Sequence, residues 1–249
     1  MEEIIRNKEY RLYILDGYGT CCSDDPRPVP SALTHPLRGG AMSSPQSSSM
    51  TIPQHIVVEK DACIDMVLLV LPGVSCDVKL DVRLAGEGAE ANIYGAYVCG
   101  GEEKVKISVD MHHDLPHCNS RQLFKGIAGG TSRVDFYGKI IVAQDAQRTE
   151  AYQENHNILL SDGAKVDTKP QLEIYADDVK CSHGATIGRL NEEEQFYMRS
   201  RGITLEDAKL LQMISFIAPV LENIKDEAQR ETLSAEFESD IRNIIRNQQ

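Results

Sequence analysis

Apolar residues between about 51 and 188 come in short runs that are rich in β-branched side chains and separated by polar or glycine-containing turns. No stretch in this region has the 3.6-residue periodicity of an amphipathic helix. The pattern therefore predicts a series of short β-strands, at 56–58, 65–71, 78–84, 91–98, 105–111, 134–142 and 172–175.

A turn phrase recurs between these strands, in which a polar or glycine-containing turn is followed by a small apolar residue and then a polar one. The small residues are Ala62, Val74, Ala89, Ala146, Ala164 and Val179. Within the sets 62–89 and 146–179, successive copies are 12, 15 or 18 residues apart. A loose repeat of this size favours the stacked turns of a β-solenoid. A β-sandwich, whose turns recur every 8–12 residues, is the alternative.

The first fifty residues differ from this pattern. We expect a short strand pair within residues 1–20, with Tyr10–Leu15 as one strand. Five prolines and a serine-rich run then disfavour regular structure, so residues 21–50 are predicted to form an irregular loop.

Helical signals replace strand signals after Gly188. Asn191 can cap a first helix, with Glu194 three residues later completing a capping box, and Gly202 suits the helix end. We therefore divide the chain into an N-terminal segment (1–50), a β-helix core (51–188) and a helical module (189–249).

Two further helices complete the predicted module. Thr204 and Asp207 begin the second, whose apolar residues keep helical spacing until Pro219, and the third begins at about Asp226. A small helical module at this place can cap the solenoid or hold a partner.

Charge and composition narrow the function classes. Lys and Arg number 26 against 38 Asp and Glu, which gives a net charge of −12 and argues against a general nucleic-acid or anionic-membrane surface. No apolar run approaches the length of a membrane span, and the charged N-terminus does not resemble a signal peptide. We expect a soluble, cytoplasmic protein. The seven cysteines are odd in number and scattered, which argues against a disulfide framework or a four-thiolate metal site.

No common catalytic motif is present. The glycine-rich run 126–130 lacks the Lys-Ser/Thr of a phosphate-binding loop, and no nucleophile elbow or His-Glu-x-x-His occurs. The densest set of potential ligands is His112, His113, Asp114, His117 and Cys118. The three histidines and Cys118 suggest a metal-dependent enzyme as one hypothesis. Strand alternation, however, would send His112 and His113 to opposite faces, so a polar strand end is the plainer interpretation.

A second pair of candidate ligands is Cys181 and His183. In a strand they face the same side, where a thiolate and an imidazole can bind iron or another soft metal. Lys180 is close enough in sequence to favour a thiolate. A purely structural role for both residues is the alternative.

Longer motifs make the sequence recognisable. The run Asp167–Thr186, with Lys-Cys-Ser-His-Gly-Ala-Thr at its end, closely resembles the signature of the SufB/SufD family of SUF iron–sulfur cluster assembly. The segments 121–126, 136–140 and 196–203 fit the same family. Within it the chain resembles SufD, because the stretch Gln153–Ser161 lacks the cysteine of the SufB pattern.

This resemblance implies a fold and a role. The fold is a right-handed parallel β-helix followed by helices that dock SufC, an ABC-type ATPase. The role is a non-enzymatic scaffold that pairs through the β-helix with a SufB homologue or with itself. It implies no catalytic residue and no stably bound cofactor, only transient iron or an iron–sulfur cluster. Most SufD chains also have a helical N-terminal domain, which is not recognisable here.

The resemblance also assigns residues. The histidine of the motif, His183, is expected to meet iron or the nascent cluster at the dimer interface, with Cys181 a weaker candidate. Docking of SufC, or capping of the solenoid, is expected to involve Phe196, Tyr197, Leu210, Leu211 and Ile214.

Overall fold

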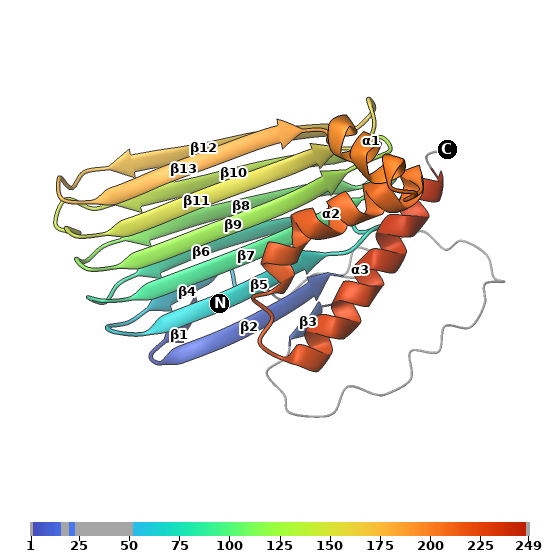
Figure 1. Ribbon diagram of the computed structural model, residues 1–249. Helices are drawn as coiled ribbons and strands as arrows, with labels where there is room; N and C mark the ends of the chain where they lie inside the picture. Colours follow the sequence, from blue (N-terminus) through green and yellow to red (C-terminus); the bar gives the residue numbers. More distant parts are fainter. Residues whose placement is uncertain (1, 16–19, 23–51, 248–249) are drawn as a thin grey trace.

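A computed structural model describes residues 2–15, 20–22 and 52–247 of the chain, which form two sheets and three helices (Figure 1). Sheet A consists, in spatial order, of β1 (Glu2–Ile5), β4 (His55–Val58), β6 (Cys76–Leu84), β8 (Lys104–His113), β10 (Arg133–Val142) and β12 (Lys165–Ile174). Sheet B consists of β13 (Lys180–Gly188), β11 (Glu150–Leu159), β9 (Asn119–Ala128), β7 (Glu90–Cys99), β5 (Cys63–Val70), β2 (Lys8–Leu15) and β3 (Thr20–Cys22).

The chain alternates between the two sheets, and this alternation makes a parallel β-solenoid of about five turns. Along sheet B, Cys63 pairs with Glu90, Glu90 with Asn119, Asn119 with Glu150, and Glu150 with Lys180. One full turn therefore advances the chain by 27 to 31 residues, about twice the spacing of the turn phrase. The solenoid prediction is confirmed and the sandwich alternative is wrong.

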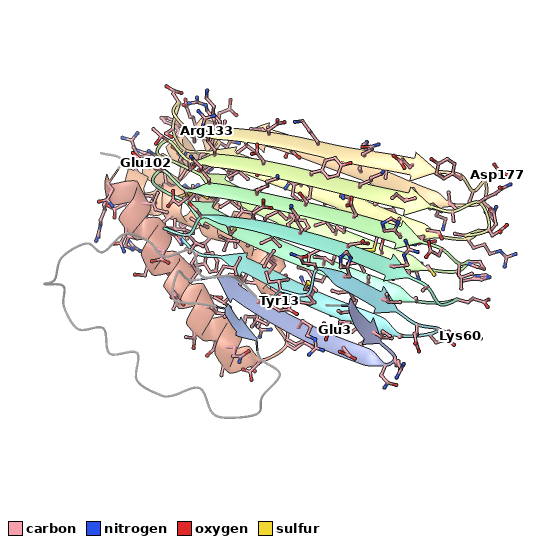
Figure 2. All side chains as sticks on the ribbon, turned by 180° about the vertical axis from the view of Figure 1, so that it is seen from behind. Glu3, Tyr13, Lys60, Glu102, Arg133 and Asp177 are labelled. Atoms are coloured by element: carbon pink, nitrogen blue, oxygen red, sulfur yellow. The ribbon has the colours of Figure 1, made fainter. Side chains whose placement is uncertain are left out.

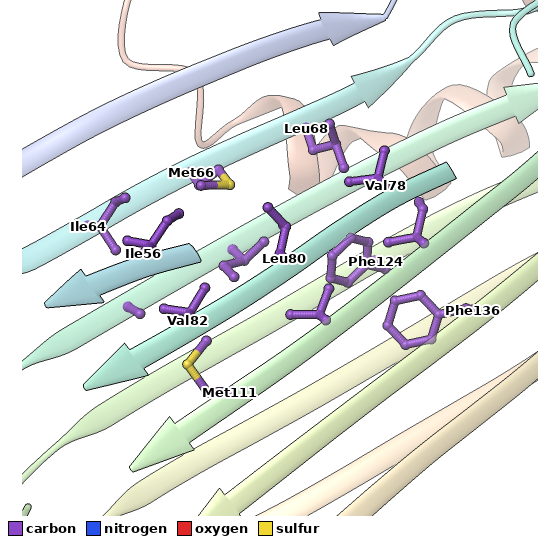
Figure 3. Close-up of a cluster of buried hydrophobic side chains, with 14 of the residues drawn as sticks. Ile56, Ile64, Met66, Leu68, Val78, Leu80, Val82, Met111, Phe124 and Phe136 are labelled. Atoms are coloured by element: carbon purple, nitrogen blue, oxygen red, sulfur yellow. The ribbon is translucent and has the colours of Figure 1, made fainter. Parts of the chain in front are cut away.

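The inward-facing side chains of both sheets form the core of the solenoid (Figure 3). Met66 from sheet B and Leu80 from sheet A are almost fully buried there. Phe124 and Phe136 meet across the interior with ring centroids 4.9 Å apart. Burial of side chains of this size stabilises the fold by about 1.5–3 kcal/mol each.

The turns along one side of the solenoid stack on one another, from one coil to the next. The residues with positive φ angles in these turns are Asp61, Gly88, His117 and Arg148. The backbone N–H of each donates to a carbonyl in the next turn, such as Asp61 to Glu87 and His117 to Gln147. The small residues that follow, such as Ala62 and Ala89, are buried, as the turn phrase predicts.

The N-terminal strands differ from the prediction. β1 and β2 do not pair with each other: β1 pairs with β4 in sheet A, whereas β2 pairs with β5 in sheet B. The predicted strand at Tyr10–Leu15 is confirmed as part of β2, but β1 is not its partner, because β1 and β2 extend different sheets of the solenoid. Cys21 and Cys22, predicted as loop, lie in β3, which pairs antiparallel with β2. The rest of the predicted loop, 23–50, lies outside the described residues.

Helix α1 (Glu192–Ser200) follows β13 and begins as predicted. The Asn191 side chain accepts hydrogen bonds from the backbone N–H groups of Glu193 and Glu194, and Gly202 beyond the helix has a φ angle of +89°. Helix α2 (Leu205–Leu221) is capped by Thr204, whose Oγ1 accepts from the backbone N–H of Asp207. α2 continues two residues past Pro219, where the sequence predicted its end. Helix α3 (Glu227–Asn247) follows Asp226.

The helices cover part of the outer face of sheet B and create a second apolar core. Leu69 and Val98 of the sheet pack there with Met213 and Ile217 of α2 and Phe237 of α3. Figure 2, the view from behind, shows the outer face of sheet A with its side chains projecting and the helices on the far side. Among the described helices, none has both the length and the apolar composition needed to cross a membrane.

Candidate functional site

The last turn of the solenoid is open. β12 and β13 are the terminal strands of their sheets, and within the described residues no strand pairs with their outer edges (Figure 1). Inward-facing residues that are buried in earlier turns are therefore uncovered here. Ile187 of β13 is 45 % exposed, although its register partner Asn157 is 2 % exposed. Ile174 of β12 is likewise exposed, beside buried Val142.

His183 lies in the middle of this open end. Its register partner on β11 is Gln153, which is 1 % exposed and faces the interior, so His183 occupies the inward-facing side of β13. The imidazole is exposed, and no described residue donates to it or accepts from it. The imidazole that the sequence predicts as a ligand is therefore exposed and available to bind one.

Cys181 lies on the same face as His183, as strand alternation predicts. It is half-buried and packs against the solenoid core. Burial raises the pKa of the Cys181 thiol, and a hydrogen bond with the backbone of Ala151 opposes this only in part. Lys180 does not favour a thiolate, because its Nζ donates to Glu150 Oε1 at 2.7 Å. The thiol is therefore protonated near neutral pH, whereas the His183 imidazole is exposed.

Buried amides lie beneath the open end, and the sequence analysis did not identify them. Gln153 Nε2 donates to Gln122 Oε1 at 2.9 Å, and both side chains are almost fully buried. Within the described residues, Gln153 Oε1 and Gln122 Nε2 have no hydrogen-bonding partner. Gly138 on β10 leaves the space for this pair, since a Cβ atom there would lie 2.2 Å from Gln153 Nε2.

The second candidate cluster does not form one site. His113 faces the interior, where its Nε2 lies 2.9 Å from Ser120 Oγ, whereas His112 faces outward, 3.4 Å from Asp81. His117 occupies a left-handed turn position, and the buried Cys118 thiol points to the Gly86 carbonyl. In the described part of the chain, no group of three or more His, Cys, Asp or Glu side chains is arranged to hold a metal ion. This arrangement does not support a metal-dependent enzyme.

The helical module presents a surface that is apolar and uncovered. Phe196 and Tyr197 of α1 are 74 % and 60 % exposed, and Leu211 of α2 is 47 % exposed. Tyr197 and Leu211 line a groove of about 810 Å³ between α1, α2 and the end of β11, which also includes Phe216.

Two of the predicted docking residues have a structural role. Leu210 is 3 % exposed and belongs to the core between α2 and sheet B, and Ile214 packs against that core. Lys125 of β9 adds a cation–π contact, with its Nζ 4.6 Å from the centre of the Phe216 ring. Burial against this helix lowers the pKa of Lys125. Leu210 therefore packs between α2 and sheet B and is not part of the exposed apolar surface.

Comparisons with known proteins agree with the motifs. Residues 43–216 match the family described as SUF system FeS cluster assembly, SufBD core domain. The chain is 43 % identical over 153 residues to the iron–sulfur cluster assembly protein SufD of Escherichia coli, covering 61 % of this chain and 36 % of that protein.

Other relatives belong to the same group. A SufBD family protein of Mycobacterium leprae is 31 % identical over 195 residues, covering 75 % of this chain and 50 % of the relative. A SufBD family protein of Synechocystis is 47 % identical over 109 residues, covering 44 % of this chain and 24 % of the relative. The chain thus spans between about a quarter and a half of the length of these relatives. The family match extends over most of the chain and includes β4 to β13, the open end and α1, and the chain belongs to the SufBD family of SUF-system iron–sulfur cluster assembly proteins.

Proposed function

We propose that this chain is a scaffold component of the SUF system that pairs through the open end of its solenoid and binds a SufC-type ATPase through α1 and α2. The observation that carries the proposal is the exposure of inward-facing side chains on β12 and β13. We expect the protein to act in the cytoplasm, with no nucleic-acid or membrane partner.

The edges of the two sheets favour pairing at the open end. A terminal strand presents unpaired N–H and C=O groups that associate readily with another strand. Here the same end also exposes Ile174 and Ile187, which are apolar and project toward the interior. A solenoid end of matching shape, from a SufB homologue or from a second copy, would cover both the edges and the apolar side chains.

Iron or a nascent iron–sulfur cluster is the cargo of this surface. His183 offers an imidazole nitrogen at the centre of the open end, where a partner would enclose it. Imidazole is a suitable ligand for iron. A single side chain holds a metal weakly, so the cargo is expected to be shared with the partner and to remain transient.

Exposed aromatic side chains on α1 favour this helix as the ATPase-binding surface. Aromatic residues are enriched at protein interfaces. Phe196 and Tyr197 are both exposed on α1, and Tyr197 lines the groove together with Leu211. The sequence contains no phosphate-binding loop of its own, so ATP hydrolysis would belong to the partner.

Co-purification tests both surfaces. The tagged chain is expressed anaerobically with the SufC-type ATPase of the same organism, with and without a SufB homologue. We expect a stoichiometric complex that a Phe196→Ser, Tyr197→Ser double variant loses. Leu115→Ser is the matched control. Leu115 is an exposed apolar residue in the turn between β8 and β9, on the side of the solenoid away from α1. Failure of the unmodified chain to retain the ATPase under both conditions would reject the docking role.

The pairing surface and the cargo need separate variants. Ile187→Lys should abolish pairing, seen as a loss of the dimer in sedimentation, while ATPase binding persists. His183→Ala should leave the dimer intact and stop cluster assembly. Assembly at the unmodified rate with His183→Ala would show that the histidine has no role in it.

A further inference from the structure

Three inward-facing residues of sheet B form a column that ends at the open end of the solenoid. Gln122 on β9 is the register partner of Gln153 on β11, and Gln153 is the register partner of His183 on β13. The two glutamines are buried and joined by one hydrogen bond, whereas His183 is exposed. The column therefore leads from the core to the candidate ligand.

The upper amide of the column has an unused acceptor. Gln153 Nε2 donates to Gln122 Oε1, which leaves Gln153 Oε1 buried and without a partner in the part of the chain that the structure describes. Leaving a buried polar atom unpaired destabilises the folded state. The interior nevertheless accommodates this side chain, because Gly138 opposite it has no Cβ atom to fill the space. A buried, oriented carbonyl oxygen of this kind is suited to accept a hydrogen bond from a group that arrives later.

His183 is the neighbour that can supply that hydrogen bond. Adjacent strands of a sheet lie about 4.8 Å apart, so register partners on one face are within reach of each other's side chains. The ring has no partner among the described residues. Gln153 Oε1 belongs to the register partner of His183 and has no hydrogen-bonding partner within the described residues, so a ring N–H turned toward β11 can donate to it.

We propose that Gln153 is the positioning residue of His183. One ring nitrogen of the neutral imidazole donates its hydrogen to Gln153 Oε1, and the lone pair of the other nitrogen then faces the open end and the metal. Metal-binding histidines almost always donate their second ring N–H to a nearby acceptor, which fixes the tautomer. This inference rests on the proposed role of His183 and adds the group that decides which nitrogen binds.

The test is nitrogen-15 NMR of the imidazole rings in the full chain saturated with Zn²⁺, with His183 assigned by its loss in His183→Ala. We expect one set of His183 signals, with the same nitrogen bound to zinc in every molecule. In Gln153→Met, which keeps the length but removes the acceptor, we expect two sets of signals. The Zn²⁺ affinity assigned to His183 should fall by about 10- to 100-fold.

Two controls separate orientation from folding. His156 faces outward on the same strand as Gln153 and is held by Thr186 and Glu154, so its signals should not change. Gln153→Glu keeps a carbonyl oxygen, and its protonated carboxyl can still donate to Gln122 Oε1. It should therefore keep a single set of His183 signals and the unmodified affinity.

Each failure has a distinct meaning. If Gln153→Met leaves both the His183 signals and the affinity unchanged, Gln153 does not position the ring. If Gln153→Glu loses as much as Gln153→Met, packing and not the acceptor matters, which also overturns the inference. Cluster assembly at the unmodified rate in His183→Ala would instead reject the proposed function, whatever the NMR of the Gln153 variants.

Discussion

Gly138 and Gln153 face each other across the interior of the solenoid, and a Cβ atom on Gly138 would lie 2.2 Å from Gln153 Nε2. The flexible amide cannot simply move aside, because it is buried and bonded to Gln122. We expect Gly138→Ala to lower the free energy of unfolding by about 1–3 kcal/mol through overpacking, as measured by urea denaturation.

Gly184 provides the matched control for this prediction. It lies on the last turn, where an added Cβ atom would meet nothing within 4 Å, so Gly184→Ala should change stability far less. A second check is Gln153→Ala in the Gly138→Ala background, which removes the clash. Equal stabilities of the Gly138→Ala and Gly184→Ala chains would contradict the packing argument.

Buried His113 makes the stability of the fold depend on pH. Burial, and to a lesser extent the charge of nearby His112, lowers the pKa of His113 to about 4 from an ordinary value of 6.5. The unfolded chain therefore binds a proton between pH 6.5 and 4 that the folded chain does not. The contribution of His113 is complete above pH 6.5 and is lost as the pH falls toward 4, with a slope of at most about 1.4 kcal/mol per pH unit.

Replacing this histidine should remove that part of the pH dependence. His113→Gln keeps a side chain that can hydrogen-bond Ser120 but does not titrate, so its stability should fall less between pH 6.5 and 4 than that of the unmodified chain. The control is His117→Asn, an exposed position with a left-handed backbone that asparagine tolerates. Identical urea midpoints across this range for His113→Gln and the unmodified chain would contradict the assignment.

Neighbouring leucines on α2 should separate stability from partner binding. Leu210 is 3 % exposed in the core between α2 and sheet B, so Leu210→Ala should cost about 2–5 kcal/mol of unfolding free energy. Leu211 is exposed at the groove, and Leu211→Ala should change stability by no more than about 0.5 kcal/mol. Urea denaturation measures the free energy of unfolding of both variants. Among the chains that remain folded, only Leu211→Ala should retain less ATPase. Similar losses of stability in the two variants would contradict this division.

The solenoid could be predicted from the turn phrase, because small residues such as Ala62 and Ala89 must be buried where turns stack. β9 and β11 were not predicted as strands. Their inward-facing positions include Gln122, Gln153 and Asn155, which are buried amides and break the apolar pattern. Alternating hydropathy cannot identify a strand whose interior side is polar.

The candidate site could be predicted only as far as it depends on a single strand. Strand alternation places Cys181 and His183 on one face, and the structure agrees. Gln153 could not be found in this way, because its position beneath His183 depends on a register that joins residues 30 apart in sequence. The influence expected of Lys180 was wrong for a similar reason, since its partner Glu150 belongs to the preceding turn.

The engagement of Lys180 gives a final prediction about Cys181. The Lys180 ammonium is bound to Glu150, while burial is the main cause of the raised pKa of the Cys181 thiol. Lys180→Met should therefore change the alkylation rate of Cys181 at neutral pH by less than about twofold, followed by mass spectrometry of the peptide that contains it. Covering the open end should slow the same reaction, because the half-buried thiol lies on the face that the proposed partner encloses. A severalfold slower alkylation in the isolated Lys180→Met chain would instead mean that the lysine stabilises the thiolate, and Cys181 would return as a ligand beside His183.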